Sequence, residues 1–251
     1  MQVIVDGLLT HYERLGSGKR VVVILHGWGD SSRSWLDVAR QLGQAFTVIV
    51  PDLPGFGGSA PPPSAWDLSD YAQFISHFLQ KLNVDKVYTL VGHSNGGGVA
   101  IRGLAQGSLR ADRLVLLASA GIRGEYNGRV KALRYATKFG KALSTPLPKS
   151  IKKRLRQKVY SSVGSDMLVT EHMQVTFKKV VTDDVREDAA TLHLPTLIVY
   201  GDRDQQTPAA YGEMFHELIK GSKLEILRGA DHFIFTEEPG VLIDTTKEFL
   251  T

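Results

Sequence analysis

Residues 90–98 read Leu-Val-Gly-His-Ser-Asn-Gly-Gly-Gly, and they join a predicted strand to a predicted helix. The residues before them, 86–91, are rich in β-branched side chains, whereas residues 99–105 have the composition of a short buried helix. Ser94 therefore lies where the strand turns into the helix. Its surroundings fit G-x-S-x-G, a strained turn that lifts a serine hydroxyl clear of a sheet. The pattern predicts a nucleophilic serine, although an ordinary glycine-serine turn would carry the same five residues.

The glycines around Ser94 follow from the same turn. A Cβ atom at Gly92 or Gly96 would clash at the bend, so the motif requires glycine there. Gly97 and Gly98 lie inside the predicted helix, where each glycine costs about 1 kcal/mol relative to alanine. We therefore expect this helix to pack closely on the sheet.

The chain has 251 residues, of which 43% are hydrophobic and 22% charged, as is typical of one large α/β domain with a small insertion. No apolar run reaches the roughly 18 residues of a membrane span. The sequence starts in strand-like residues without a basic and apolar leader, so we expect a cytoplasmic protein. Cysteine is absent, which excludes disulfides, thiolate metal sites and a cysteine nucleophile.

Strands and helices alternate along most of the chain. Parallel strands need crossovers, and helices supply them, so the alternation predicts an α/β fold with a mostly parallel eight-stranded sheet and helices on both faces. The expected strands are short apolar or β-branched runs at residues 2–5, 8–15, 20–25, 46–50, 86–91, 113–118, 195–200 and 223–227.

The net charge of +4 is unevenly distributed. Residues 122–164 contain twelve Lys and Arg against one acidic residue, Glu125. A block of this charge between strand-rich segments indicates a separate insertion. We therefore predict a core domain of residues 1–121 and 191–251, interrupted by a helical cap of residues 122–190.

A serine hydroxyl is a weak nucleophile at neutral pH, so Ser94 needs a general base, and the base needs an orienting group. Functional groups in open parallel sheets gather past the carboxyl ends of the strands, which selects His26, His93 and His232 among eight histidines. His93 adjoins Ser94, so its side chain should point elsewhere, and His26 opens the loop after an earlier strand. His232 follows the last predicted strand and is the predicted base.

Two carboxylates, Asp202 and Asp204, follow a predicted strand. The order Ser94, Asp204, His232 along the chain is the order found where the nucleophile lies on a strand-to-helix turn. Asp204 is therefore the predicted orienting acid. Asp202 is expected to bond nearby backbone amides in its turn.

Attack on an acyl carbonyl creates an oxyanion, which preorganised backbone N–H groups stabilise. Asn95, the residue after the nucleophile at a helix start, supplies one predicted donor. Glycines beside Trp28 let the backbone approach a substrate, so its N–H is the second predicted donor, although a plain glycine-rich turn would share these residues. The residues expected to line the substrate site are His26, Gly27, Phe56, His93 and Phe233.

Five segments of the chain together carry a family resemblance: residues 26–29, 52–59, 92–97, 201–204 and 231–233. The chain resembles the α/β-hydrolase superfamily, and within it the capped, fold-1-like serine esterases and hydrolases. The resemblance implies that Asp204 is the triad acid, that the Asp52 loop shapes the site wall and that the cap sets substrate choice. Serine at position 94 differs from the aspartate of haloalkane dehalogenases and epoxide hydrolases.

The motifs predict a serine hydrolase that cleaves carboxylic esters of small to medium acyl chains through an acyl-enzyme, with no metal or cofactor. Carbon–carbon bond hydrolysis of a diketone would use the same triad. A small-molecule receptor could also keep these residues and use the pocket for binding. Both alternatives stay open on the sequence.

The predicted cap has helical patterns at residues 128–139, 149–163 and 166–180. Its second helix combines an apolar stripe with many cations, which fits either a solvated lid or attraction of an anionic substrate or membrane surface. Nucleic acid is not expected, because no aromatic residues interleave the basic ones. The cations concerned are Lys152, Lys153, Arg154, Arg156 and Lys158.

Overall fold

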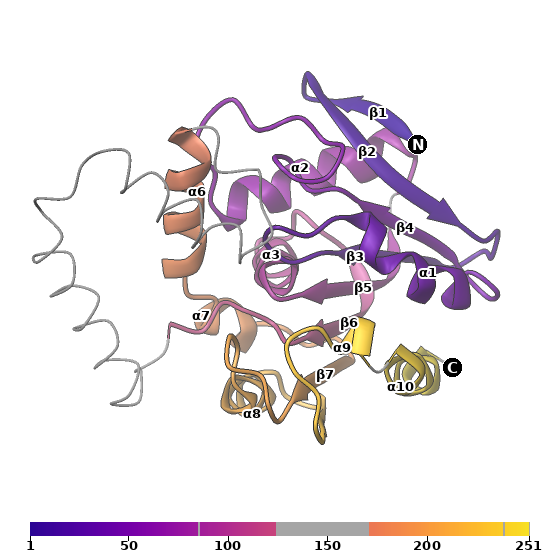
Figure 1. Cartoon of the computed structure of the whole chain (residues 1–251), viewed down its shortest axis with the longest axis vertical. Helices are drawn as coiled ribbons and strands as arrows, with labels where there is room; N and C mark the ends of the chain where they lie inside the picture. The colour runs from indigo at the N-terminus through magenta and orange to yellow at the C-terminus, as the bar shows by residue number, and fades with distance from the viewer. Residues whose placement is uncertain (85, 124–170, 238, 251) are drawn as a thin grey trace, which may run out of the picture.

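The computed structural model describes residues 1–84, 86–123, 171–237 and 239–250 (Figure 1). Its strands are β1 (Gln2–Val5), β2 (Leu8–Leu15), β3 (Val21–Leu25), β4 (Thr47–Pro51), β5 (Val87–His93), β6 (Ala111–Leu117), β7 (Thr196–Gly201) and β8 (Lys223–Leu227). The described helices are a 3-10 turn (Ser32–Trp35), α1 (Leu36–Leu42), α2 (Leu68–Lys81), α3 (Asn95–Ala105), α6 (Glu171–Thr182), α7 (Arg186–Ala190), α8 (Ala209–Leu218), α9 (Ile234–Glu237) and α10 (Pro239–Leu250).

The eight strands form one sheet in the order β1-β2-β4-β3-β5-β6-β7-β8. β1 and β2 pair antiparallel, and β2 joins β4 antiparallel, whereas all later pairs are parallel. Leu25 of β3 lies beside Gly92 of β5, which lies beside Leu116 of β6. The predicted eight-stranded, mostly parallel sheet is confirmed. Its register brings the loops after β3, β5, β7 and β8 to one edge of the sheet, where ligands bind in such folds.

Hydrophobic layers cover both faces of the sheet (Figure 1). One layer contains α2, α3 and α8, and the other contains α1 and α10. Strand residues alternate between the layers: Val23 and Leu25 face α2 and α3, while Val22 and Ile24 face α1 and α10. All four side chains are fully buried. Burial on both faces explains why β3 is an uninterrupted apolar run.

Helix α2 starts at a complete capping box. The Asp67 carboxylate accepts the N–H groups of Ser69 and Asp70, and the Asp70 carboxylate accepts the N–H of Asp67. The Tyr71 hydroxyl, one turn further on, donates to the backbone oxygen of Pro54 at 3.1 Å. The start of α2 therefore anchors the loop that follows β4.

Helices α6 and α7 form the described end of the predicted cap. Residue Trp66 donates its N–H to Thr176 Oγ1 at 3.0 Å, and Lys179 Nζ donates to Ala65 O at 2.9 Å, so α6 is fixed to the loop before α2. α6 overlaps the predicted third cap helix. None of the helices in the described part of the chain is long and apolar enough to span a membrane.

Residues 124–170 of the predicted cap lie outside the described residues. This applies to the helices predicted at 128–139 and 149–163. It also applies to the basic residues Lys152, Lys153, Arg154, Arg156 and Lys158. The boundaries of the cap and its attraction for anionic partners therefore stay predictions.

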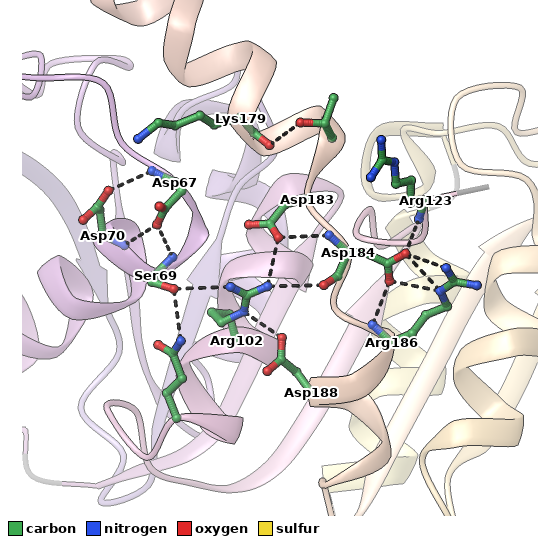
Figure 2. Close-up of polar contacts among 12 residues, drawn as sticks. Asp67, Ser69, Asp70, Arg102, Arg123, Lys179, Asp183, Asp184, Arg186 and Asp188 are labelled. Carbon is green, nitrogen blue, oxygen red and sulfur yellow. Dashed lines mark hydrogen bonds and ion pairs between the residues drawn. The ribbon is translucent and has the colours of Figure 1, made fainter. Parts of the chain in front are cut away.

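Arg102 of α3 holds the segment that links α6 and α7 to the core (Figure 2). Its Nε lies 2.6 Å from Asp188 Oδ2, and its Nη2 lies 2.9 Å from Asp183 Oδ1. The Arg102 side chain is 17% exposed. Burial disfavours the charged form, but hydrogen bonds to Asp188 and the charge of Asp183 raise the pKa of Arg102 above its usual value. One cation thus joins α7 and the end of α6 to the helix that starts after Ser94.

Asp184 joins the two ends of the predicted insertion (Figure 2). Its Oδ2 accepts the N–H of Arg123 at 3.3 Å and an N–H of the Arg186 guanidinium at 2.7 Å. Partial burial opposes ionisation, yet these bonds hold the pKa of Asp184 below its ordinary value. The chain therefore leaves and re-enters the core at one ionic cluster.

Replacing Arg102 with glutamine should lower the free energy of unfolding by about 2–3 kcal/mol, because two largely enclosed carboxylates would lose their charged partner. Urea unfolding measures this loss. Arg40→Gln is the matched control, since Arg40 and its partner Asp37 are 61% and 82% exposed and such pairs contribute little. Equal losses in both variants would contradict the assignment of Arg102 as the anchor.

Candidate active site

Ser94 occupies the bend between β5 and α3 with φ 50° and ψ −117°. A residue other than glycine in this region costs on the order of 1–3 kcal/mol. Two backbone hydrogen bonds hold it there: Ser94 N–H donates to Leu117 O at 3.0 Å, and Ser94 O accepts from Ala120 N–H at 2.9 Å. The strained turn predicted from G-x-S-x-G is confirmed.

The glycines after Ser94 allow α3 to lie against neighbouring chain segments. A Cβ atom at Gly96 would overlap the backbone oxygen of Leu25, and one at Gly97 would overlap the side chain of Ser119. α3 therefore contacts both β3 and the loop after β6 at distances that only glycine permits. The close packing expected of this helix is confirmed.

Asp204 and His232 form a buried pair past the carboxyl ends of β7 and β8. His232 Nδ1 lies 2.7 Å from Asp204 Oδ2, and the two residues are only 5% and 6% exposed. A carboxylate accepts, so Nδ1 carries the proton and Nε2 is the basic nitrogen. Nε2 makes no hydrogen bond to another described residue. The structure brings together the base and acid that the chain order predicts.

The surroundings of Asp204 keep its carboxylate charged. Asp204 Oδ1 accepts the N–H groups of Gln206 at 2.7 Å and Thr207 at 2.9 Å. Burial opposes ionisation, but the hydrogen bonds and charge of His232, together with the Thr207 bonds, hold the pKa of Asp204 below its ordinary value of 3.8. Asp204 can therefore orient an imidazole and balance positive charge on it at neutral pH.

Thr207 is a residue of this site that the sequence reasoning missed. Its hydroxyl lies 2.8 Å from Asp204 Oδ2, 3.1 Å from His232 Nδ1 and 2.9 Å from Ala118 O. The hydroxyl can thus support both members of the pair. The sequence did contain a signal for Thr207. An aspartate in a turn commonly bonds the backbone amides two or three residues further on, and Thr207 follows Asp204 by three residues. Thr207 also directly precedes Pro208, which caps the start of α8.

Thr207→Val should lower kcat about tenfold and change KM less, because removing one hydrogen bond from a buried charged pair costs on the order of 1.4 kcal/mol. Thr207→Ser keeps the hydroxyl and should recover most of the activity. Steady-state kinetics on an ester that the wild type cleaves measure both effects. An unchanged kcat in the valine variant would contradict the assignment of Thr207 to the site.

Asp202 has a different place from Asp204. It is exposed, and its Oδ1 accepts the N–H of Gly229 at 2.7 Å. Its own N–H donates to Leu227 O at 3.1 Å, so the residue ties the loop after β7 to the end of β8. The prediction that Asp202 bonds backbone amides in a turn is confirmed.

The two predicted oxyanion donors belong to segments that adjoin the nucleophile. Asn95 is the first residue of α3, so its N–H has no acceptor within the helix. A Cβ atom at Gly27 would lie 3.2 Å from Ser94 Cβ, which places the backbone leading to Trp28 directly beside the serine. The Asn95 side chain is also buried, and neither of its polar atoms has a partner among the described residues.

Aromatic side chains flank the same loops. The Trp28 ring contacts Phe56 edge-on at 4.8 Å between centroids and Phe177 of α6 at 5.1 Å. Phe56 is buried, so it supports Trp28 from the core side. Phe233 is 42% exposed and meets the His232 ring edge-on at 5.3 Å. Phe233 thus supplies apolar surface beside the imidazole, and Trp28 and Phe177 form a second aromatic contact next to the loop that adjoins Ser94.

Two histidines expected to line the substrate site are buried and hydrogen-bonded to backbone groups. His26 is fully buried; its Nδ1 donates to Gly27 O at 2.7 Å, and its Nε2 accepts the N–H of Leu53 at 2.9 Å. Burial lowers the pKa of His26, and the nearby Asp30 only partly opposes this. His93 is also buried and bonds the backbone oxygen of His232. Both rings are enclosed by the protein, and the expectation that they contact a substrate stays a prediction.

Asp52 organises the loop after β4. Its buried carboxylate accepts the N–H groups of Ser32 at 2.6 Å and Gly58 at 2.7 Å, and it lies 3.1 Å from His11 Nδ1. These contacts fasten the loop after β4 to the start of the helical segment after β3. Asp52 therefore acts on the shape of this loop, which also carries Phe56.

Comparison with known proteins gives a consistent family. A family model described as alpha/beta hydrolase family matches residues 22–245. An uncharacterised protein of Mycobacterium tuberculosis is 30% identical over 275 residues, which cover 98% of this chain and 79% of that protein. The crystal structure of a membrane phospholipase A from a bacterium has a TM-score of 0.80 at 25% identity and covers 100% of this chain and 84% of that one.

A solved esterase from Exiguobacterium antarcticum has a TM-score of 0.75 at 26% identity, over 99% of this chain and 98% of that chain. The family model spans most of the sheet, the elbow at Ser94 and the pair of Asp204 and His232. The chain therefore belongs to the alpha/beta hydrolase family.

Proposed function

We propose that the protein is a serine hydrolase that cleaves carboxylic esters of small to medium acyl chains, with Ser94 as nucleophile, His232 as base and Asp204 as orienting acid. The observation that carries the proposal is the buried 2.7 Å contact between His232 Nδ1 and Asp204 Oδ2, on the edge of the sheet where Ser94 is strained. An imidazole oriented through Nδ1 has its Nε2 available to deprotonate a serine. The similarity to an esterase supports the same class.

In the acylation step, His232 Nε2 takes the proton of the Ser94 hydroxyl while Oγ bonds the ester carbonyl carbon. The carbonyl oxygen becomes an oxyanion that the N–H groups of Asn95 and Trp28 stabilise. Asp204 stays ionised and balances the imidazolium. The C–O bond to the alcohol then breaks, and the alcohol leaves with the proton from His232. An acyl group remains on Ser94.

In the deacylation step, a water molecule replaces the alcohol. His232 takes a proton from the water as its oxygen bonds the acyl carbon, and the same two amides stabilise the second oxyanion. The bond to Ser94 Oγ breaks, and the serine regains its proton from His232. The carboxylic acid is released, and the enzyme returns to its starting state.

The aromatic surface beside these groups bears on the substrate. Trp28, Phe177 and Phe233 can contact an acyl chain or an apolar alcohol, and each buried CH₂ contributes about 0.8 kcal/mol. We therefore propose that affinity increases with acyl length over short and medium chains.

A series of p-nitrophenyl esters from acetate to palmitate tests this function, with Ser94→Ala as the control. We expect many turnovers per enzyme and an optimum at a small or medium acyl chain. A diketone in the same panel tests carbon–carbon bond hydrolysis. Faster turnover of the diketone than of any ester would indicate that the same three residues cleave carbon–carbon bonds. A single slow turnover followed by retention of product would instead indicate a receptor.

A further inference from the structure

His93 lies between three parts of the proposed catalytic apparatus. It ends β5 and directly precedes Ser94. Its ring is 4.8 Å from that of His232 and 4.9 Å from that of Phe235, measured between centroids, and the residue is 2% exposed. A Cβ atom at Gly27 would lie 2.9 Å from His93 Nδ1, so the ring also lies against the loop that carries the second proposed oxyanion donor.

One hydrogen bond joins His93 to the proposed base. His93 Nε2 lies 2.9 Å from the backbone oxygen of His232. A carbonyl oxygen only accepts, so Nε2 must carry a proton, and in the neutral ring Nδ1 is then bare. Nδ1 is buried and has no partner among the described residues. The Nε2 bond is therefore the polar contact that fixes the ring, and leaving Nδ1 unpaired has a free-energy cost.

The environment also fixes the charge of His93. Burial and then the neighbouring His232 lower its pKa to about 3, although the bond to the His232 backbone and the charge of Asp204 oppose the shift and His26 adds to it. His26, His232 and Asp204 are the titratable groups that act on the ring. A neutral His93 adds no positive charge beside the imidazolium that forms on His232 during the proposed reaction.

We propose that His93 is a positioning residue, which sets the distances of the His232 backbone and of the Gly27 loop from Ser94. The inference rests on the function proposed above. A ring that only filled space in the core could be replaced by an apolar side chain of similar size. A positioning ring needs the donor at Nε2. Glutamine can place an N–H near that atom, whereas methionine has a similar length and no donor.

The test compares the kinetics of His93→Met and His93→Gln with those of the wild type, and the melting temperature of each protein is measured as the control for folding. In the methionine variant we expect kcat to fall about 10–100-fold, as a displaced catalytic group commonly causes, while KM changes less than about threefold. The kcat of the glutamine variant should be about tenfold or more above that of the methionine variant. Full activity in the methionine variant, or equal losses in both, would overturn the proposal.

A second measurement does not depend on activity or on the variants folding. Long-range ¹⁵N NMR of the wild-type histidines should show His93 as the Nε2–H tautomer without titration between about pH 5 and 8, because its pKa is lowered to about 3. An Nδ1–H tautomer or titration in that range would overturn the proposal. Wild-type protein without any esterase activity would contradict the proposed function, whereas an active wild type with a fully active methionine variant would contradict only the role of His93.

Discussion

Ser94→Ala should lower ester turnover by about 10⁴–10⁶-fold, which corresponds to roughly 5–8 kcal/mol of lost transition-state stabilisation. The alanine variant lacks the oxygen that bonds the acyl carbon, and no other described residue occupies the strained bend between β5 and α3. The remaining oxyanion donors can still accelerate attack by water to a small extent. Steady-state kinetics with the best ester of the series measure the loss.

The same variant has a labelling readout. A fluorophosphonate should modify the wild type at Ser94 and leave Ser94→Ala unmodified, because the reagent needs an activated serine. Circular dichroism and melting temperature should be close to wild type, since alanine removes one oxygen only. Retention of most of the activity by a folded Ser94→Ala protein would refute the nucleophile assignment.

Asp204→Asn should lower kcat by about 10⁴-fold. An asparagine in this buried position can present an N–H to His232 Nδ1 and so favour the tautomer whose Nε2 carries the proton, which cannot deprotonate a serine. It also removes the charge that balances the imidazolium. The measurement is kcat at saturating ester, with KM expected to change far less.

Asp202→Asn is the matched control for this variant. Its carboxylate is exposed and bonds the N–H of Gly229, a bond that the asparagine oxygen can keep, so kcat should stay within about twofold of the wild type. The hydrogen bonds and charge of His232 hold the pKa of Asp204 below its ordinary value of 3.8, so the rate profile near neutral pH should show no step from Asp204. A larger loss in Asp202→Asn than in Asp204→Asn would mean that the orienting acid is misassigned.

The sheet and the elbow could be predicted because their causes are local. β3 is an apolar run between glycine-containing segments, and β5 is rich in β-branched and apolar residues. The residues at 92–97 leave few conformations other than a tight strand-to-helix turn. The pair of Asp204 and His232 could be predicted from topology, because parallel strands deliver both residues to one edge.

Other features depend on contacts between residues far apart in the sequence. Arg102 and Asp188 are 86 positions apart, and no periodic pattern marks either one as the anchor of α7. His26 and His93 follow strands as a functional histidine would, but both are buried. His26 accepts the N–H of Leu53, and His93 donates to the backbone oxygen of His232. Position past a strand selects candidates, whereas hydrogen bonding distinguishes them: both ring nitrogens of His26 are bonded to backbone groups, and only Nδ1 of His232 is bonded to another described residue.

The acyl-enzyme is the intermediate that the account requires, and mass spectrometry can detect it. The protein is mixed with an excess of p-nitrophenyl butyrate, quenched in acid during the burst of nitrophenol release, and digested. We predict a butyryl group on the peptide that contains Ser94, in an amount that matches the burst, and none in Ser94→Ala. Sustained turnover with the acyl group on another residue, or with no acyl-enzyme under conditions that show a burst, would contradict the account.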